Sequence, residues 1–296
     1  MWSSSTCRSH GRGCRSRCTT SPGRSGASRS VPPRTTKPPE SVYYERRGRT
    51  DGAAPPVLFL HGLGSSAADW APQLGPFGER YRLLLVDLPG HWRSALPRER
   101  LTIEAMAERV DALLDQLDTP PAHVVGLSLG GSVGLELALR APARVRSLTL
   151  VNAFARLGPP DAAGGLRMLA RLVLLGVAPM SVVAAFVARG LFPEPQQAHL
   201  YRLAVASLGR TSRWTYLASI GALVAFDARA RLGRVACPTL VVAGERDRTV
   251  SLASTAALGR DIPGARVELV PDSGHVTNRD QPTIFNRTVL DFLAAH

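Results

Sequence analysis

The sequence predicts an α/β fold with a doubly wound, mostly parallel sheet, a helical lid insertion and a disordered N-terminal tail. Short runs rich in Val and Leu alternate with helical patterns, as expected for parallel strands covered on both faces. The alternation stops between residues 153 and 236 and then resumes, which indicates an insertion. The predicted strands span residues 57–60, 82–86, 123–127, 145–151, 239–243 and 267–270.

Residues 1–40 are rich in Ser, Arg, Gly and Pro and hold few large apolar side chains. Such a segment buries too little surface to offset its chain entropy, so we expect it to be disordered. It has no apolar run typical of a secretory signal, while a transit peptide and a misassigned start codon stay open as alternatives. Its eight basic residues and one acidic residue supply +7 of the total charge of +13. Residues 41–296 supply the remaining +6, and we expect no nucleic-acid partner, with nucleic-acid contact of the tail as an alternative.

The cysteines argue against both a disulfide framework and a zinc site. Cys7, Cys14 and Cys18 lie in the tail without C-x-x-C spacing or paired histidines, and Cys237 precedes a predicted strand as a small buried side chain. This usage fits a reducing compartment, so we expect a cytoplasmic protein without a metal or other cofactor.

Two amphipathic helices flank the predicted core, which comprises residues 41–152 and 237–296. Apolar residues recur at helical spacing over 102–118, where Thr102 is suited to cap the first turn, and again after Pro282. The apolar positions are Met106, Val110, Leu113, Leu114 and Leu117 in the first helix, and Phe285, Val289, Phe292 and Leu293 in the second.

The insertion, residues 153–236, is dominated by Leu, Ala, Val and Arg with Gly and Pro breaks, and predicts several short helices. Leu172–Ala188 carries no charge over 17 residues. Pro179 lies in its middle and its length is at the lower limit for a membrane span. We therefore expect a cap over a pocket and no stable span, with contact at a membrane surface as an alternative.

The pentapeptide Gly126-Leu127-Ser128-Leu129-Gly130 joins a predicted strand to a helical pattern. This strand–turn–helix setting is typical of a nucleophile elbow, in which a sharp turn lifts the serine hydroxyl off the sheet. Gly126 and Gly130 allow neighbouring chain to approach closely. The pattern predicts Ser128 as a nucleophile.

A serine nucleophile needs a base, and the base needs a carboxylate that orients it. His275 directly follows the last predicted strand, and Asp247 follows the strand before it. Loops at the carboxyl ends of parallel strands meet at one edge of a sheet, so we expect both side chains near Ser128. Asp272 and Glu245 are the alternatives for the acid.

The other histidines favour structural roles. His123 begins a strand, while His61 and His91 lie in turns with glycine, where bonds to the backbone are the simpler role. Asp87 stands before a Pro-Gly pair and favours turn formation.

An acyl-transfer site also needs donors for the developing oxyanion. The amide of Leu129 directly follows the nucleophile, and the amide of Leu63 lies in a loop after the first predicted strand. Gly62 and Gly64 flank Leu63 and allow that loop to turn an amide inward.

Together these motifs resemble the α/β-hydrolase fold superfamily across residues 42–296. The matching pieces are His61-Gly62-Leu63-Gly64, Asp87-Leu88-Pro89-Gly90-His91, Gly126-Leu127-Ser128-Leu129-Gly130-Gly131, Gly244-Glu245-Arg246-Asp247 and Gly274-His275. The resemblance implies Ser128 as nucleophile, Asp247 as acid, His275 as base and a lid at residues 153–236. Within the superfamily the chain is similar to the esterase, enol-lactonase and carbon–carbon hydrolase branches. The serine at the elbow disfavours haloalkane dehalogenases and epoxide hydrolases, which use aspartate there.

One position departs from the family pattern. Relatives read Gly-His-Gly-x-Ser where this chain reads Gly90-His91-Trp92-Arg93-Ser94. A left-handed backbone is costly at Trp92, so we expect this loop to follow another path, with the indole at the pocket mouth or under the lid.

These observations predict a cofactor-free serine hydrolase that cleaves a carboxylic ester or lactone, and the apolar lid favours a hydrophobic substrate. Arg167, Arg171 and Arg213 of the lid are candidates to meet a substrate carboxylate, although solvated faces explain them as well. A carbon–carbon bond hydrolase with the same triad and a non-catalytic binding protein stay open as alternatives.

Overall fold

The computed structural model describes residues 42–158 and 162–296, so the predicted tail and its three cysteines lie outside the described residues. The strands are β1 (Tyr44–Gly48), β2 (Pro56–Leu60), β3 (Arg82–Val86), β4 (Ala122–Leu127), β5 (Val145–Val151), β6 (Thr239–Gly244) and β7 (Arg266–Val270). The helices are α1 (Ala71–Gly78), α2 (Ile103–Gln116), α3 (Leu129–Arg140), α4 (Ala162–Val177), α5 (Met180–Leu191), α6 (Ala198–Leu208), α7 (Arg213–Ala225), α8 (Leu252–Asp261), α9 (Thr277–Asp280) and α10 (Pro282–Ala294).

The strands form one sheet in the order β1-β3-β2-β4-β5-β6-β7. Every neighbouring pair is parallel except β1 with β3, which is antiparallel. The predicted α/β fold with a mostly parallel sheet is therefore confirmed. β1 is an addition to the prediction: its sequence YERRG reads as polar because the strand lies at an edge, with its last three residues exposed.

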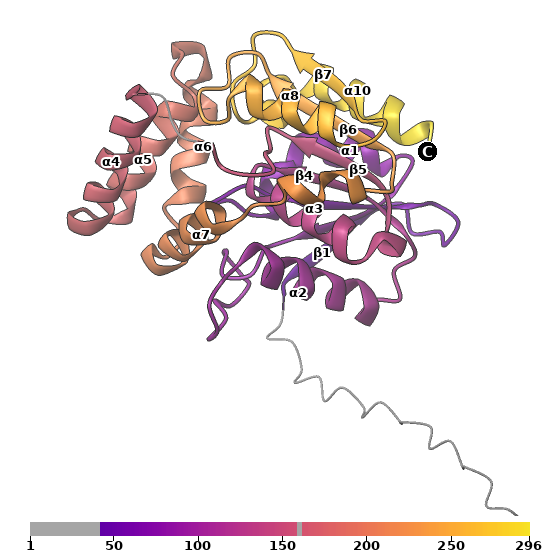
Figure 1. The fold of residues 1–296 in the computed structure, drawn as a ribbon. Coiled ribbons are helices and arrows are strands. Elements are labelled where there is room, and N and C mark those ends of the chain that lie inside the picture. Colours follow the sequence, from indigo (N-terminus) through magenta and orange to yellow (C-terminus); the bar gives the residue numbers. More distant parts are fainter. Residues whose placement is uncertain (1–41, 159–161) are drawn as a thin grey trace, which may run out of the picture. The chain divides into compact units, whose positions relative to one another are not determined.

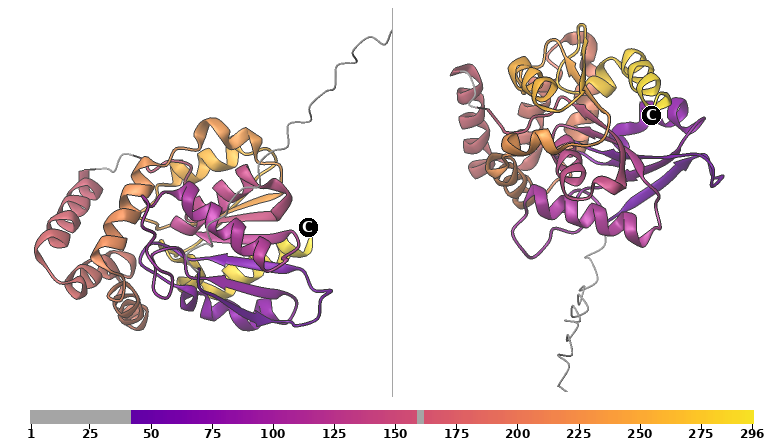
Figure 2. Two further views of the ribbon diagram at one scale, coloured as in Figure 1. Left: turned by 90° about the horizontal axis from the view of Figure 1, so that it is seen from below. Right: turned by 45° about the vertical axis from the view of Figure 1, so that its right-hand side comes forward.

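Helices cover both faces of the sheet (Figures 1 and 2). In β2 the side chains of Leu58 and Leu60 belong to the core cluster that includes α2 and α3, whereas Val57 and Phe59 belong to the cluster that includes α1 and α10. Neighbouring side chains of a strand point to opposite faces, and both faces of β2 are buried, which explains its continuous apolar run.

The two predicted amphipathic helices are present. Thr102 caps α2, because its Oγ1 accepts a hydrogen bond from the amide of Ala105 at 3.1 Å. In α10 the apolar residues Phe285, Val289, Phe292 and Leu293 are all buried, as their spacing predicts.

Between β5 and β6 the described residues form helices α4 to α7, which lie together on one side of the sheet in both figures. No strand forms in the described part of residues 153–236, apart from an isolated bridge between Arg156 and Asp227. We call residues 162–225 the helical segment. It has its own apolar cluster, formed by Leu175, Val183, Ala184, Ala188, Leu208 and Tyr216. No helix among the described residues is long and apolar enough to cross a membrane.

Candidate active site

Ser128 lies in a strained turn between β4 and α3, with φ 51° and ψ −110°. A non-glycine residue rarely holds a positive φ, and its neighbours must impose that conformation. A Cβ added at Gly126 would lie 2.3 Å from the carbonyl oxygen of Gly130, and one at Gly130 would lie 2.1 Å from that of Leu60. Glycine is therefore required at Gly126 for β4 to pack against the start of α3, and at Gly130 for α3 to pack against the end of β2.

The structure brings the three predicted side chains into one hydrogen-bonded chain. Nε2 of His275 lies 3.0 Å from Oγ of Ser128, and Nδ1 of His275 lies 2.8 Å from Oδ2 of Asp247. An ionised carboxylate only accepts hydrogen bonds, so Nδ1 carries the proton and Nε2 is left to accept the serine hydroxyl. This arrangement suits His275 for taking a proton from Ser128.

The carboxylate of Asp247 is stabilised in its charged form. Burial by itself would raise its pKa, but the adjacent His275 and the amides of Val250 and Thr249 together hold that pKa below its ordinary value. The two amides donate to Oδ1 at 3.0 Å and 2.7 Å. Asp247 therefore remains an acceptor for the imidazole well into the acidic range.

Two residues that the sequence argument missed complete this arrangement. Asn152, directly after β5, donates from Nδ2 to Oδ2 of Asp247 at 2.9 Å. Thr277, at the start of α9, donates from its hydroxyl to Oδ1 of Asn152 at 2.7 Å. Both are fully buried. Their only sequence signal is that Asn152 follows a predicted strand, at the same edge of the sheet as Ser128 and Asp247.

The alternative acids have other partners or face solvent. Asp272 is exposed and pairs with Arg246, and Glu245 is exposed. The remaining histidines have structural contacts, as expected: Nδ1 of His61 lies 2.8 Å from the carbonyl oxygen of Gly62, and His123 lies 2.7 Å from the hydroxyl of Ser147.

The loop after β2 lies beside the elbow. A Cβ added at Gly62 would be 3.7 Å from the carbonyl oxygen of Leu127, the residue before the nucleophile. Gly64 has φ 72° and packs against Leu208 of α6, where an added Cβ would meet Cδ2 at 2.5 Å. Leu129 is the first residue of α3, so its amide belongs to the helix N-terminus. The roles of the Leu63 and Leu129 amides stay predictions.

The expectation that the loop avoids a left-handed backbone at Trp92 is wrong, because Trp92 has φ 41°. The turn is held from both sides. The fully buried Asp87 accepts from the amide of Ala67 and from Nε of Arg93, each at 2.8 Å. The guanidinium groups of Arg93 and Arg210 lie 4.2 Å and 5.1 Å from the centroid of the Trp92 ring system. These contacts offset the backbone strain and place the indole against the turn between α6 and α7.

The three arginines of the helical segment have neighbours of their own. Arg171 donates to the hydroxyl of Tyr216, Arg213 donates to the carbonyl of Ala178 at 2.7 Å, and Arg167 donates to the carbonyl of Arg248 at 3.5 Å. Their contacts explain them without a substrate carboxylate.

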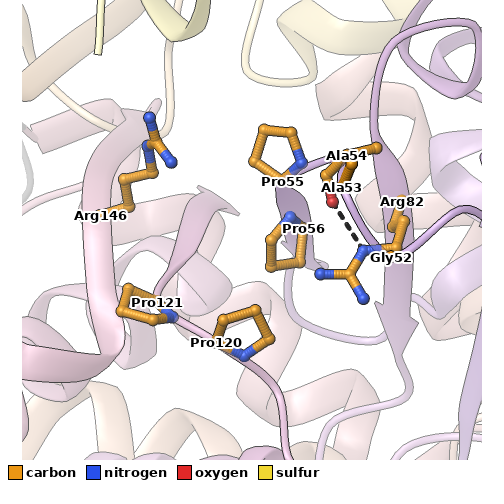
Figure 3. A pocket seen from close by; sticks show the side chains of 9 residues that line it. All are labelled: Gly52, Ala53, Ala54, Pro55, Pro56, Arg82, Pro120, Pro121 and Arg146. Atoms are coloured by element: carbon orange, nitrogen blue, oxygen red, sulfur yellow. Dashed lines mark hydrogen bonds between the residues drawn. The ribbon is translucent and has the colours of Figure 1, made fainter.

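Two cavities differ in their relation to these residues. A small one of about 40 Å³ touches His275 and is lined by Arg246, Arg248 and the segment between α5 and α6. A larger one of about 330 Å³ lies at the amino ends of the strands, between Pro56, Arg82 and Arg146 (Figure 3). There Nε of Arg82 donates to the carbonyl of Ala54 at 2.7 Å. Because Ser128 lies at the opposite ends of the strands, we do not assign the larger cavity to the reaction.

Comparison with known proteins identifies the family of this chain. The model of the α/β hydrolase fold family matches residues 55–282. A protein of Variovorax paradoxus named "Putative carbamate hydrolase RutD" is 38% identical, with 86% of this chain and 96% of that protein covered. One of the same name from Agrobacterium fabrum is 36% identical, with coverages of 85% and 98%.

Solved structures of hydrolases also resemble this chain. An enol-lactonase from Burkholderia xenovorans superposes with a TM-score of 0.79 at 29% identity, covering 86% of this chain and 96% of that one. A hydrolase from Pseudomonas aeruginosa superposes with a TM-score of 0.77 at 32% identity, covering 85% and 94%.

Proposed function

Because the chain belongs to the α/β-hydrolase fold family, we propose that it is a serine hydrolase that cleaves a carboxylic ester or lactone. That it is a hydrolase of this fold follows from its relatives. The serine mechanism rests on one observation, the continuous hydrogen-bonded chain from Ser128 through His275 to Asp247.

In the proposed first half-reaction Nε2 of His275 takes the proton of Ser128 as Oγ attacks the substrate carbonyl carbon. The carbonyl oxygen becomes an oxyanion, which the amides of Leu63 and Leu129 stabilise. Each such donor contributes roughly 3–4 kcal/mol to the transition state. When the carbon–oxygen bond breaks, the imidazolium gives its proton to the leaving alkoxide, and the acyl group stays on Ser128.

In the second half-reaction His275 takes a proton from water, which attacks the acyl carbon. The ester bond to Ser128 breaks, Oγ recovers a proton and the carboxylic acid leaves. Throughout, Asp247 keeps Nδ1 as a donor and stabilises the positive charge that forms on the ring. A lactone follows the same steps, except that its alcohol and acid remain in one molecule.

The substrate class has two sources of support. The enol-lactonase resemblance, at 29% identity over 86% of the chain, favours a lactone or an activated ester. The partly buried Leu63 packs against the apolar cluster of the helical segment, so an acyl group beside its amide would meet Leu208 and Tyr216. This environment favours a hydrophobic acyl group.

A carbamate is the second candidate substrate, because the curated relatives carry the name carbamate hydrolase. Ser128 would attack the carbamate carbonyl, the bond to the alcohol oxygen would break with a proton from His275, and the intermediate would be a carbamoyl ester on Ser128. The nitrogen lone pair lowers the electrophilicity of that carbonyl, so the second half-reaction would be slow enough to give a burst of the first product.

A fluorophosphonate probe tests the serine mechanism directly, since it reacts only with an activated hydroxyl. The wild-type protein should be labelled at Ser128, and Ser128→Ala should not. Ser132→Ala is a matched control: Ser132 lies one turn further along α3, is fully buried, and its hydroxyl has no hydrogen-bond partner among the described residues. It should label as the wild type does. A folded wild-type protein that resists the probe would contradict the proposed mechanism.

A substrate panel then separates the candidates. We expect turnover of p-nitrophenyl esters and enol-lactones, lost in Ser128→Ala. Turnover restricted to p-nitrophenyl carbamates would indicate that the substrate is a carbamate and not an ester or lactone. Turnover restricted to a ring-fission diketone would indicate a carbon–carbon hydrolase instead.

A further inference from the structure

We propose that Asn152 is a positioning residue that holds Asp247 against His275, and that Thr277 sets the orientation of its amide. The inference rests on the proposed serine mechanism and deepens it.

The backbone of Asn152 is held in place by its surroundings. Asn152 directly follows β5, has φ 46° and is fully buried. Its amide nitrogen donates to the carbonyl of Val242 in β6 at 2.8 Å. Asparagine tolerates the left-handed region better than most residues do, because its side chain is short and polar. The side chain of Asn152 is therefore attached to a well-held backbone at the carboxyl ends of the strands.

From that point one amide group reaches both segments that carry the acid and the base. Nδ2 of Asn152 donates to Oδ2 of Asp247 at 2.9 Å and to the carbonyl oxygen of Gly274 at 3.3 Å. Asp247 lies in the loop after β6, and Gly274 is the residue before His275 in the loop after β7. The amide thus links the two loops whose separation sets the contact between acid and base.

The orientation of this amide follows from its neighbours. A carboxylate and a carbonyl only accept hydrogen bonds, so the NH₂ of Asn152 must face Asp247 and Gly274. Its Oδ1 then faces the hydroxyl of Thr277, 2.7 Å away. The same hydroxyl accepts from Ser273 Oγ at 3.1 Å, and Asn152 is the nearer of its two acceptors, because the carbonyl oxygen of Gly274 lies 3.3 Å away. Thr277 therefore opposes a flip of the amide.

Without Asn152 the carboxylate of Asp247 would lose one of the four donors around it. Oδ1 would keep the amides of Thr249 and Val250, but Oδ2 would keep only His275. The side chain of Asp247 is only 1% exposed, so solvent cannot readily supply the missing donor. A carboxylate held on one side only can turn away from Nδ1, and the imidazole then loses its fixed tautomer.

The rate at which a fluorophosphonate labels Ser128 tests this role without knowledge of the substrate. Asn152→Ala should label about ten- to a hundredfold more slowly than wild type. Asn152→Asp keeps the shape but replaces a donor with an acceptor and adds a second carboxylate. This charge favours the imidazolium, so the acidic limb of the rate against pH should move to higher pH.

Thr277 gives the conservative comparison. Thr277→Val removes the hydroxyl and should slow labelling less than Asn152→Ala does, because the amide remains but can flip. Thr277→Ser restores the hydroxyl and should restore most of the rate.

Asn286→Ala is the matched control for the loss of a buried amide. Asn286 is 9% exposed and bonds to Gln73 and to the carbonyl of Pro72, away from Ser128. It should lower the melting temperature without moving the pH profile. If Asn152→Ala and Asn152→Asp are folded and label with the wild-type rate and pH profile, the positioning role is wrong. If the wild type itself does not label, the serine mechanism has failed instead.

Discussion

The buried histidines His61 and His91 should make the fold sensitive to mild acid. Both are fully buried, with ring centroids 5.1 Å apart. Burial lowers the pKa of His61 to about 4. Burial, followed by repulsion from His61, lowers the pKa of His91 to about 3. Both rings are therefore neutral in the folded protein over the range in which the unfolded chain takes up protons.

The direction in which the free energy of unfolding changes with pH follows from the pKa of each ring in the folded and the unfolded protein. Above pH 6.5 neither the folded nor the unfolded protein binds these protons, so the two histidines do not lower the free energy of unfolding. Below pH 6.5 the unfolded chain becomes protonated and the folded protein does not, so the free energy of unfolding falls as the pH drops towards 4. Each histidine contributes about 1.4 kcal/mol per pH unit, or about 3 kcal/mol by pH 4. The pair together reaches about 6 kcal/mol, which is comparable with the whole stability of an ordinary domain.

The measurement is urea unfolding at pH 7.5, 6.5, 5.5 and 4.5 for the wild type and for His91→Asn. The new amide nitrogen would take the place of Nδ1, which lies 3.2 Å from the carbonyl of Pro89, and Nε2 of His91 has no hydrogen-bond partner in residues 42–158 and 162–296. Below pH 6 the free energy of unfolding should fall less steeply in the variant, by about 1.4 kcal/mol per pH unit. The exposed His199 gives the control, and His199→Asn should keep the wild-type slope. Parallel slopes for His91→Asn and wild type would refute the reasoning.

Three further outcomes are expected. Asp247→Asn should lower kcat on a p-nitrophenyl ester about ten-thousand-fold, because the amide favours the wrong tautomer of the base; a loss below tenfold in the folded variant would contradict its role. Arg93→Met leaves the buried Asp87 without its ion pair and should cost about 3 kcal/mol in urea unfolding, whereas Arg47→Met, at an exposed pair, should cost less than about 1 kcal/mol; equal losses would argue against a structural role for the buried pair. Trp92→Gly should change the free energy of unfolding by less than about 1 kcal/mol, because relief of the left-handed strain offsets the lost arginine contacts; Trp92→Ala keeps the strain and should be less stable than Trp92→Gly.

The central strands and the three candidate catalytic residues could be predicted from the sequence because each has a local signal. A strand buried on both faces must be a continuous apolar run, as β2 is, and the elbow around Ser128 needs glycines at fixed spacing. β1 was missed because an edge strand with a half-buried Glu and two exposed Arg looks like a loop.

Asn152 and the backbone at Trp92 could not be predicted for a different reason, since both depend on tertiary structure. A lone asparagine after a strand acquires meaning only when the order β5-β6-β7 brings Asp247 and Gly274 within reach of its amide. At Trp92 the local steric argument was sound, but the anchoring of Arg93 on the buried Asp87 outweighs it. Long-range contacts of this kind leave no pattern in neighbouring residues.

The contact of Gly64 with Leu208 and Tyr216 couples the proposed oxyanion site to the proposed acyl-binding surface. Gly64 follows the residue proposed to donate to the oxyanion, while Leu208 and Tyr216 belong to the helical segment that would face the acyl group. A graft of residues 162–225 from a relative would press a different side chain onto this glycine and shift the Leu63 amide with it. Exchanged helices would therefore alter turnover along with substrate preference, unless the residues at 208 and 216 were kept.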